Sequence, residues 1–159
     1  METGKIKEIG RFLLIFCVTF LGLYVSSFFY SGFVQKAMAF LQSALWNFLG
    51  KENYLHGTII KFEKHSIEIS FLCSGLIEWF VLVAAMVATP CKIRKKILGI
   101  GLSFVAVFIF NFFRIFVSTY VLFLNADIAS IVHEVLFRIS LFVIIAGIYY
   151  VWLNSFKNV

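Results

Sequence analysis

Four long apolar stretches restrict what this chain of 159 residues can fold into. A helix that crosses a bilayer needs about 20 mostly apolar residues. Stretches of that kind occupy residues 12–30, 71–89, 97–124 and 132–153. The composition agrees, because 62% of the residues are hydrophobic and 14% are charged, whereas soluble domains average about 45–50% and about 25%. We therefore predict an all-α membrane protein with about four transmembrane helices, and we exclude a soluble globular domain.

The distribution of Lys and Arg predicts how these helices are oriented, since short cytoplasmic loops carry an excess of both. Basic residues precede the first stretch, separate the second from the third, and follow the fourth: Lys5, Lys7 and Arg11, then Lys92, Arg94, Lys95 and Lys96, then Lys157. We expect a multi-pass protein of the cell membrane with both termini in the cytoplasm and segments 31–70 and 125–132 outside. The first stretch exceeds the about 7–15 apolar residues of a signal peptide, which favours a retained helix.

The outer segment 31–70 shows its own pattern. Apolar residues recur at helical spacing up to Phe48, and Gly50 follows as a stop, which predicts an amphipathic helix at the membrane interface with Trp46 near the headgroups. The stretches 55–62 and 67–72, separated by residues 63–66, then look like a short β-hairpin that leads into Cys73, and the alternation of Ile67, Ile69 and Phe71 with Glu68 and Ser70 is typical of a strand. The whole chain, 1–159, is expected to form one transmembrane domain.

Polar side chains at membrane depth are costly and are usually functional. At 1.5 Å per residue, Arg114 lies roughly 26 Å along its helix from Ile97, in the outer third of a core about 30 Å thick. Cys73 and His133 begin two other predicted helices at the same outer side. The sequence therefore delivers a thiol, a guanidinium and an imidazole to one layer.

These three groups suit acyl transfer. A helix N-terminus favours the thiolate of Cys73, and His133 would act as general base and then general acid. Arg114 would stabilise an oxyanion or hold a substrate carbonyl. Simpler interpretations stand beside this one: Cys73 as inert packing, His133 as a solvated interfacial residue, and Arg114 in a salt bridge with Glu78.

Other polar residues give weaker signals. Glu134 and Arg138 are four residues apart and would satisfy each other on one helix. His56 and His65 match no strong metal-site spacing, and Cys17 and Cys91 show no partner, which favours structural roles. We predict neither a metal site nor a cofactor. Because the basic residues flank apolar runs rather than forming a patch, we do not expect a nucleic-acid partner.

The ordered set Cys73-Ser74-Gly75, Asn111-Phe112-Phe113-Arg114 and His133 resembles the exosortase/archaeosortase family of membrane-embedded cysteine transpeptidases. The resemblance implies that Cys73 is the nucleophile, His133 the acid/base and Arg114 the stabilising cation. Ser74 and Gly75 belong to the motif, and Asn111 is expected to orient Arg114. It also implies substrates that are secreted proteins with a C-terminal motif, an apolar helix and a basic tail, and transfer of the acyl group to an acceptor or to water.

The chain is short for that family. A shorter bundle would either have a more open lateral entrance for the substrate helix or need self-association or a partner subunit. We also expect the chain to contact membrane lipid. Glu78 has no counterpart carried over from the family, and we expect it to pair with Arg114 or Arg138. Two other functions remain open. A small transporter or channel would use Glu78 and Arg114 and would dispense with Cys73. A non-catalytic membrane subunit would pair its buried charges with another protein.

Overall fold

A computed structural model describes residues 2–155, with the side chains of residues 2, 3, 126, 127, 130, 132–134, 136–138, 140 and 141 outside that description. The order of elements is α1 (Glu2–Ser27), α2 (Ser31–Phe48), β1 (Tyr54–His56), β2 (Ile59–Lys61), β3 (Ser66–Glu68), the 3-10 turn η1 (Phe71–Cys73), α3 (Leu76–Ala88), α4 (Ile93–Leu124) and α5 (Ala126–Ser155). The predicted mostly helical fold is confirmed.

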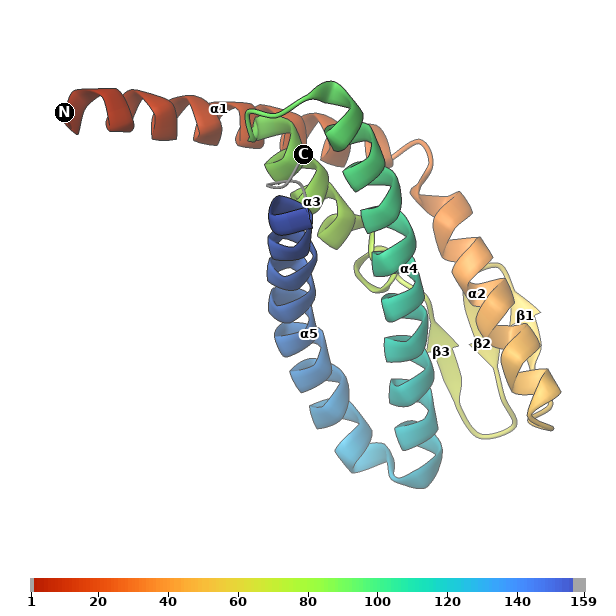
Figure 1. Ribbon diagram of the computed structural model, residues 1–159. Coiled ribbons are helices and arrows are strands. Elements are labelled where there is room, and N and C mark those ends of the chain that lie inside the picture. The colour runs from red at the N-terminus through yellow and green to blue at the C-terminus, as the bar shows by residue number, and fades with distance from the viewer. Residues whose placement is uncertain (1, 156–159) are drawn as a thin grey trace.

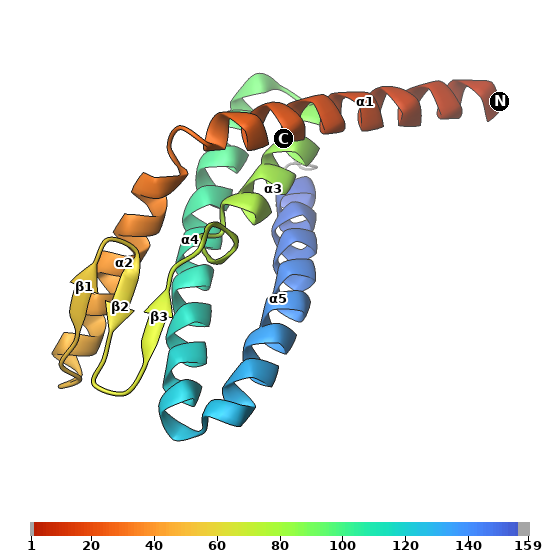
Figure 2. The same cartoon turned by 180° about the vertical axis from the view of Figure 1, so that it is seen from behind.

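Helices α3, α4 and α5 pack against one another, and α1 and α2 each pack on one of them. Helix α1 packs on α3, and α4 packs on both α3 and α5. Figures 1 and 2 show α1 running across one end of the molecule, with its N-terminal part extending beyond the other helices. Two described helices, Gly4–Ser27 and α4, are long and apolar enough to cross a membrane. The total of about four spans stays a prediction.

One predicted helix begins later than its apolar run. Residues 71–89 were expected to be continuous, but the structure has η1, then a bend at Gly75, and α3 only from Leu76. Gly75 has a φ of 79°, which glycine adopts without penalty and which ends a right-handed helical path. Helix α3 therefore has 13 residues, about 20 Å at 1.5 Å per residue, and the predicted start of the second helix is wrong.

The predicted hairpin is a three-stranded antiparallel sheet of order β1-β2-β3. The segment expected to be one strand, 55–62, turns back on itself, because His56 pairs with Ile59 across the two-residue turn Gly57-Thr58. Gly57 has a φ of 64°, as the first central position of a type II′ turn requires. The second turn joins β2 to β3, in which Ile60 pairs with Ile67.

Helix α2 is amphipathic as predicted, and Phe33 and Phe48 of its predicted apolar face are 78% and 87% exposed. The opposite face packs on the rest of the protein and is mixed, because Met38 and Ala39 are buried there beside Gln42. Trp46, expected near the headgroups, is buried and stacks on Phe116 of α4. In lipid this arrangement is favourable, because apolar side chains face acyl chains and the buried polar group finds a partner inside. Gln42 Nε2 donates to the carbonyl of Phe112 at 2.7 Å.

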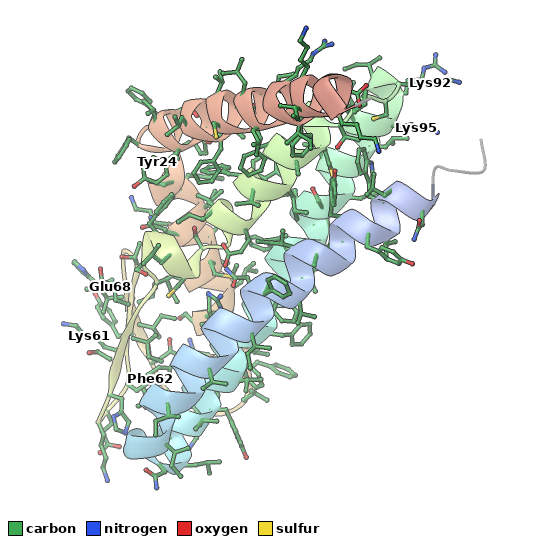
Figure 3. The ribbon with its side chains drawn as sticks, turned by 90° about the vertical axis from the view of Figure 1, so that its left-hand side faces the viewer. Tyr24, Lys61, Phe62, Glu68, Lys92 and Lys95 are labelled. Carbon is green, nitrogen blue, oxygen red and sulfur yellow. The ribbon has the colours of Figure 1, made fainter. Side chains whose placement is uncertain are left out.

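The two ends of the molecule differ in charge. Glu8, Arg11 and Lys96 line one hollow beside residues 87–90, and Trp152 near the end of α5 bonds to the Lys95 carbonyl. The basic residues that precede the first apolar stretch and those between α3 and α4 thus approach one end. Figure 3 shows Lys92 and Lys95 there, with Lys61, Phe62 and Glu68 toward the opposite end. The sheet and the turn between α4 and α5 share that opposite end (Figures 1 and 2).

Candidate active site

Cys73 ends the η1 turn, which connects β3 to α3. The turn is held by its own hydroxyl groups: Ser74 Oγ donates to the Phe71 carbonyl at 2.6 Å and accepts from the Leu76 N–H at 3.4 Å. Ser70 Oγ donates to Cys73 Sγ at 3.3 Å. A hydrogen bond to sulfur stabilises the thiolate more than the thiol. Ser74 thereby has a physical role in the motif, since it fixes the turn that carries the sulfur.

Gly75 lets α4 approach this turn closely. A Cβ at position 75 would lie 2.7 Å from Asn111 Nδ2, closer than non-bonded atoms allow. Through that gap Asn111 Nδ2 donates to the Cys73 carbonyl at 2.7 Å, and Asn111 itself is 2% exposed. Asn111 was expected to orient Arg114; its amide instead contacts Cys73. The Asn of the N-x-x-R pattern therefore holds the backbone of the cysteine.

Arg114 lies one turn farther along α4 and is buried. Its Nη1 is 3.4 Å from Glu78 Oε1 of α3, and the two residues are 6% and 5% exposed. The expected pairing of Glu78 with Arg114 is confirmed. A charge pair in this environment needs its partners in place, since removing one leaves a buried charge. Glu78 thus ties Arg114 to the helix that follows Cys73.

Cys73 and Arg114 line one cavity of about 430 Å³, within the range of about 300–1,000 Å³ typical of ligand sites. Among the described side chains, its wall consists of residues 66–69 around β3, Cys73, one face of α4, and Ala129 of α5: Ser66, Ile67, Glu68, Ile69, Cys73, Arg114, Ile115, Ser118, Thr119, Leu122 and Ala129. Ser118 Oγ is buried and has no hydrogen-bond partner among the described residues. The cavity thus combines a thiol, a guanidinium and hydroxyl groups with the segment that contains β3.

The family model of the transmembrane exosortases matches residues 7–151, nearly the entire chain. The chain belongs to the transmembrane exosortase family. Membership indicates a membrane-embedded sorting transpeptidase, which agrees with the resemblance carried by the three motifs. No curated protein and no solved structure matches the chain.

Some predicted site residues of this exosortase lie elsewhere or outside the description. The side chains of His133, Glu134 and Arg138 lie outside the described residues, although their backbone belongs to α5. Cys17 and Cys91 are exposed and do not line the cavity. His65 packs against Phe123 with ring centroids 6.2 Å apart, and neither His65 nor His56 lines the cavity.

Sequence analysis of the exosortase missed two parts of the site. One is Ser70, three residues before Cys73, whose spacing allows a hydroxyl to meet the sulfur across a single turn. The other is β3, which lines the cavity together with Ile69, the residue that follows it. Its continuity with Cys73 along the chain was visible in the sequence and is the signal that locates it.

Proposed function

We propose that this exosortase cleaves secreted proteins at a C-terminal sorting signal near the outer membrane face, with Cys73 as nucleophile. The observation that supports this most directly is that Cys73 and Arg114, from separate segments, line the same cavity. The end of the molecule that carries Lys92 and Lys95, called here the Lys-rich end, lies opposite the sheet (Figure 3). Cytoplasmic loops are rich in Lys and Arg. The proposed orientation therefore puts both termini in the cytoplasm and the cavity toward the outside.

In the proposed reaction, Cys73 Sγ attacks the carbonyl carbon of the scissile peptide bond. The carbonyl oxygen becomes an oxyanion, and the Arg114 guanidinium stabilises its charge. The C–N bond then breaks, and His133, which took the thiol proton, gives it to the leaving amine. A thioester on Cys73 remains. An acceptor amine or water attacks it, which releases the acyl group and restores the thiol.

The role of His133 rests on the sequence and on the course of α5. Residues four apart share one face of a helix, and position 133 comes four residues after Ala129, which lines the cavity. Helix α5 packs against both α3 and α4, the helices that hold Glu78 and Arg114. An imidazole from this position completes the proposed set of groups.

The test is processing of a secreted protein, encoded beside this chain, that ends in an apolar helix and a basic tail. We expect Cys73→Ala, Arg114→Ala and His133→Ala each to abolish its maturation while the chain still accumulates in the membrane. Cys91→Ala is the matched control, because Cys91 is an exposed thiol outside the cavity, and it should process normally. Normal maturation with Cys73→Ala would refute the proposed function.

The buried pair of Glu78 and Arg114 is also what a small transporter or channel would use. Loss of activity on substitution of Glu78 does not separate the two functions, because Glu78 contacts Arg114 in either case. Cys73 does separate them. A transporter keeps its activity with Cys73→Ala, whereas the peptidase loses all processing.

A further inference from the structure

The open edge of β3 faces the candidate active site. Strand β3 is at the margin of the sheet and pairs only with β2 among the described residues. Residues 66–69, which include β3, line the cavity that also holds Cys73 and Arg114. An unpaired strand edge is a template for another extended chain.

The register shows which backbone groups point to that edge. Ile69 N–H donates to the Thr58 carbonyl at 2.9 Å, and Phe62 N–H donates to the His65 carbonyl at 2.8 Å. In an antiparallel ladder, hydrogen-bonded and non-hydrogen-bonded pairs alternate. Ile67 therefore belongs to the hydrogen-bonded set. Ser66 and Glu68, between these residues, direct their N–H and C=O groups away from β2.

We infer that the substrate's sorting motif binds as a fourth strand on β3, held by the main-chain groups of Ser66 and Glu68. This inference rests on the proposed function. Adding a strand places it about 4.8 Å from β3, inside the cavity that extends to Cys73. The side chains of Ser66 and Glu68 take no part, since both are exposed, and Figure 3 shows Glu68 on the side of the sheet away from the helices.

The bound strand is parallel to β3. Strand β3 runs from the end that carries Phe62 toward Cys73 and the Lys-rich end (Figures 2 and 3). A substrate whose secreted part is outside, and whose apolar helix continues into the bilayer, runs in the same direction. The backbone edge gives affinity for an extended chain. Ser118 Oγ, which is buried in the cavity wall without a described partner, offers a hydrogen bond on the other side of that chain.

The first test separates backbone from side chain at one position. Glu68→Pro removes an N–H that β2 does not use and fills the edge with a ring, which an edge strand tolerates. Glu68→Ala keeps the backbone and is the matched control. With the substrate named above, we expect processing by Glu68→Pro to fall roughly tenfold or more below processing by Glu68→Ala, which reports what the side chain alone contributes. Equal processing by both variants, with normal accumulation, would refute strand addition.

The second test needs no catalysis and decides the matter if Glu68→Pro fails to accumulate. In a chain with Cys73→Ala, Cys17→Ser and Cys91→Ser, single cysteines replace Ser66 or Glu68. They are oxidised against substrates carrying one cysteine at successive positions of the motif. A paired strand predicts cross-links at every second position. The best position for Ser66→Cys should be two residues N-terminal to that for Glu68→Cys.

Two other results would overturn the inference. Cross-links at helical spacing, or none with a substrate that still copurifies, exclude a bound strand. The reverse order of the two best positions excludes parallel addition. Both are distinct from failure of the proposed function, which shows as normal maturation with Cys73→Ala.

Discussion

At two places along α4, a side chain packs closely against a glycine. Near Cys73, Gly75 admits Asn111, whose amide donates to the Cys73 carbonyl. Near the Lys-rich end, Gly99 admits Trp152, whose Nε1 donates to the Lys95 carbonyl at 3.1 Å. In both places a glycine lets a side chain of one helix reach the backbone of another element.

What surrounds each contact differs. The Cys73 end also buries Glu78 and Arg114 and opens into the cavity. The Lys95 end joins α4 to α5, and its residues do not line that cavity. Close packing against a glycine therefore does not by itself mark a functional site. The site is where the packed backbone carries a nucleophile and the neighbouring charges are buried, so substitutions at the two ends should separate stability from chemistry.

The largest effect is expected at Glu78. Glu78→Ala removes the carboxylate that Arg114 contacts inside the protein, and loss of one member of a buried pair costs about 3–5 kcal/mol of unfolding free energy. We expect a large drop in the thermal unfolding midpoint in detergent and in membrane accumulation. Ser103→Ala is the control, because Ser103 is equally buried but bonds only within its own helix, to the Ile100 carbonyl. Similar unfolding midpoints for the two variants would contradict a stabilising role for the pair.

The next effect compares the two glycines directly. Gly75→Ala strains a left-handed backbone by about 1–2 kcal/mol and pushes on Asn111. Gly99→Ala also crowds its neighbour Trp152, but in a helix interior it regains about 1 kcal/mol of helix propensity. We expect both to lower the unfolding midpoint, Gly75→Ala more. Only Gly75→Ala should slow alkylation of Cys73 by iodoacetamide in the folded protein.

Gly50→Ala isolates the backbone term. Gly50 has a φ of 76° and nothing within 4 Å of the position a Cβ would take. Its substitution should lower the midpoint by the strain alone and leave alkylation of Cys73 unchanged. A Gly75→Ala variant that behaves like Gly50→Ala in both measurements would show that contact with Asn111 is unimportant.

Much of this arrangement was predictable from the sequence, for physical reasons that can be named. Asn111 and Arg114 are three residues apart in a long apolar helix, so their shared face followed from helical periodicity. The need of a buried Arg for a counter-charge predicted Glu78. Helix α2 was predicted as an amphipathic helix at the membrane interface, and Phe33 and Phe48 of its apolar face are exposed. The burial of Met38 and Trp46 on its other face was not predicted, because it depends on contacts with α4 and the sheet.

The predictions that were wrong concern features that depend on single backbone angles or on contacts between residues distant in sequence. The predicted helix 71–89 contains no Pro, so only Gly75 signalled that α3 begins late. Gly57 likewise divides one expected strand into two. The continuity of β3 with Cys73 along the chain indicated that β3 lies near the site, but its place in the cavity wall depends on how the sheet packs beside α4.

The two hydrogen bonds themselves can be removed one at a time. Asn111→Ala removes a buried donor from the Cys73 carbonyl, which costs about 1–3 kcal/mol when a buried acceptor loses its partner. Trp152→Phe removes the donor to the Lys95 carbonyl while keeping most of the ring, for about 0.5–1.5 kcal/mol. We expect a modestly lower unfolding midpoint for both and a fall in substrate processing for Asn111→Ala alone, because only that bond fixes the segment that carries the sulfur. Asn111→Leu sharpens the point: it keeps about the size of the side chain but loses the Nδ2 donor, so it should process as poorly as Asn111→Ala. Full processing by Asn111→Leu would mean that the shape of the side chain, rather than its hydrogen bond to Cys73, sets the geometry of the turn.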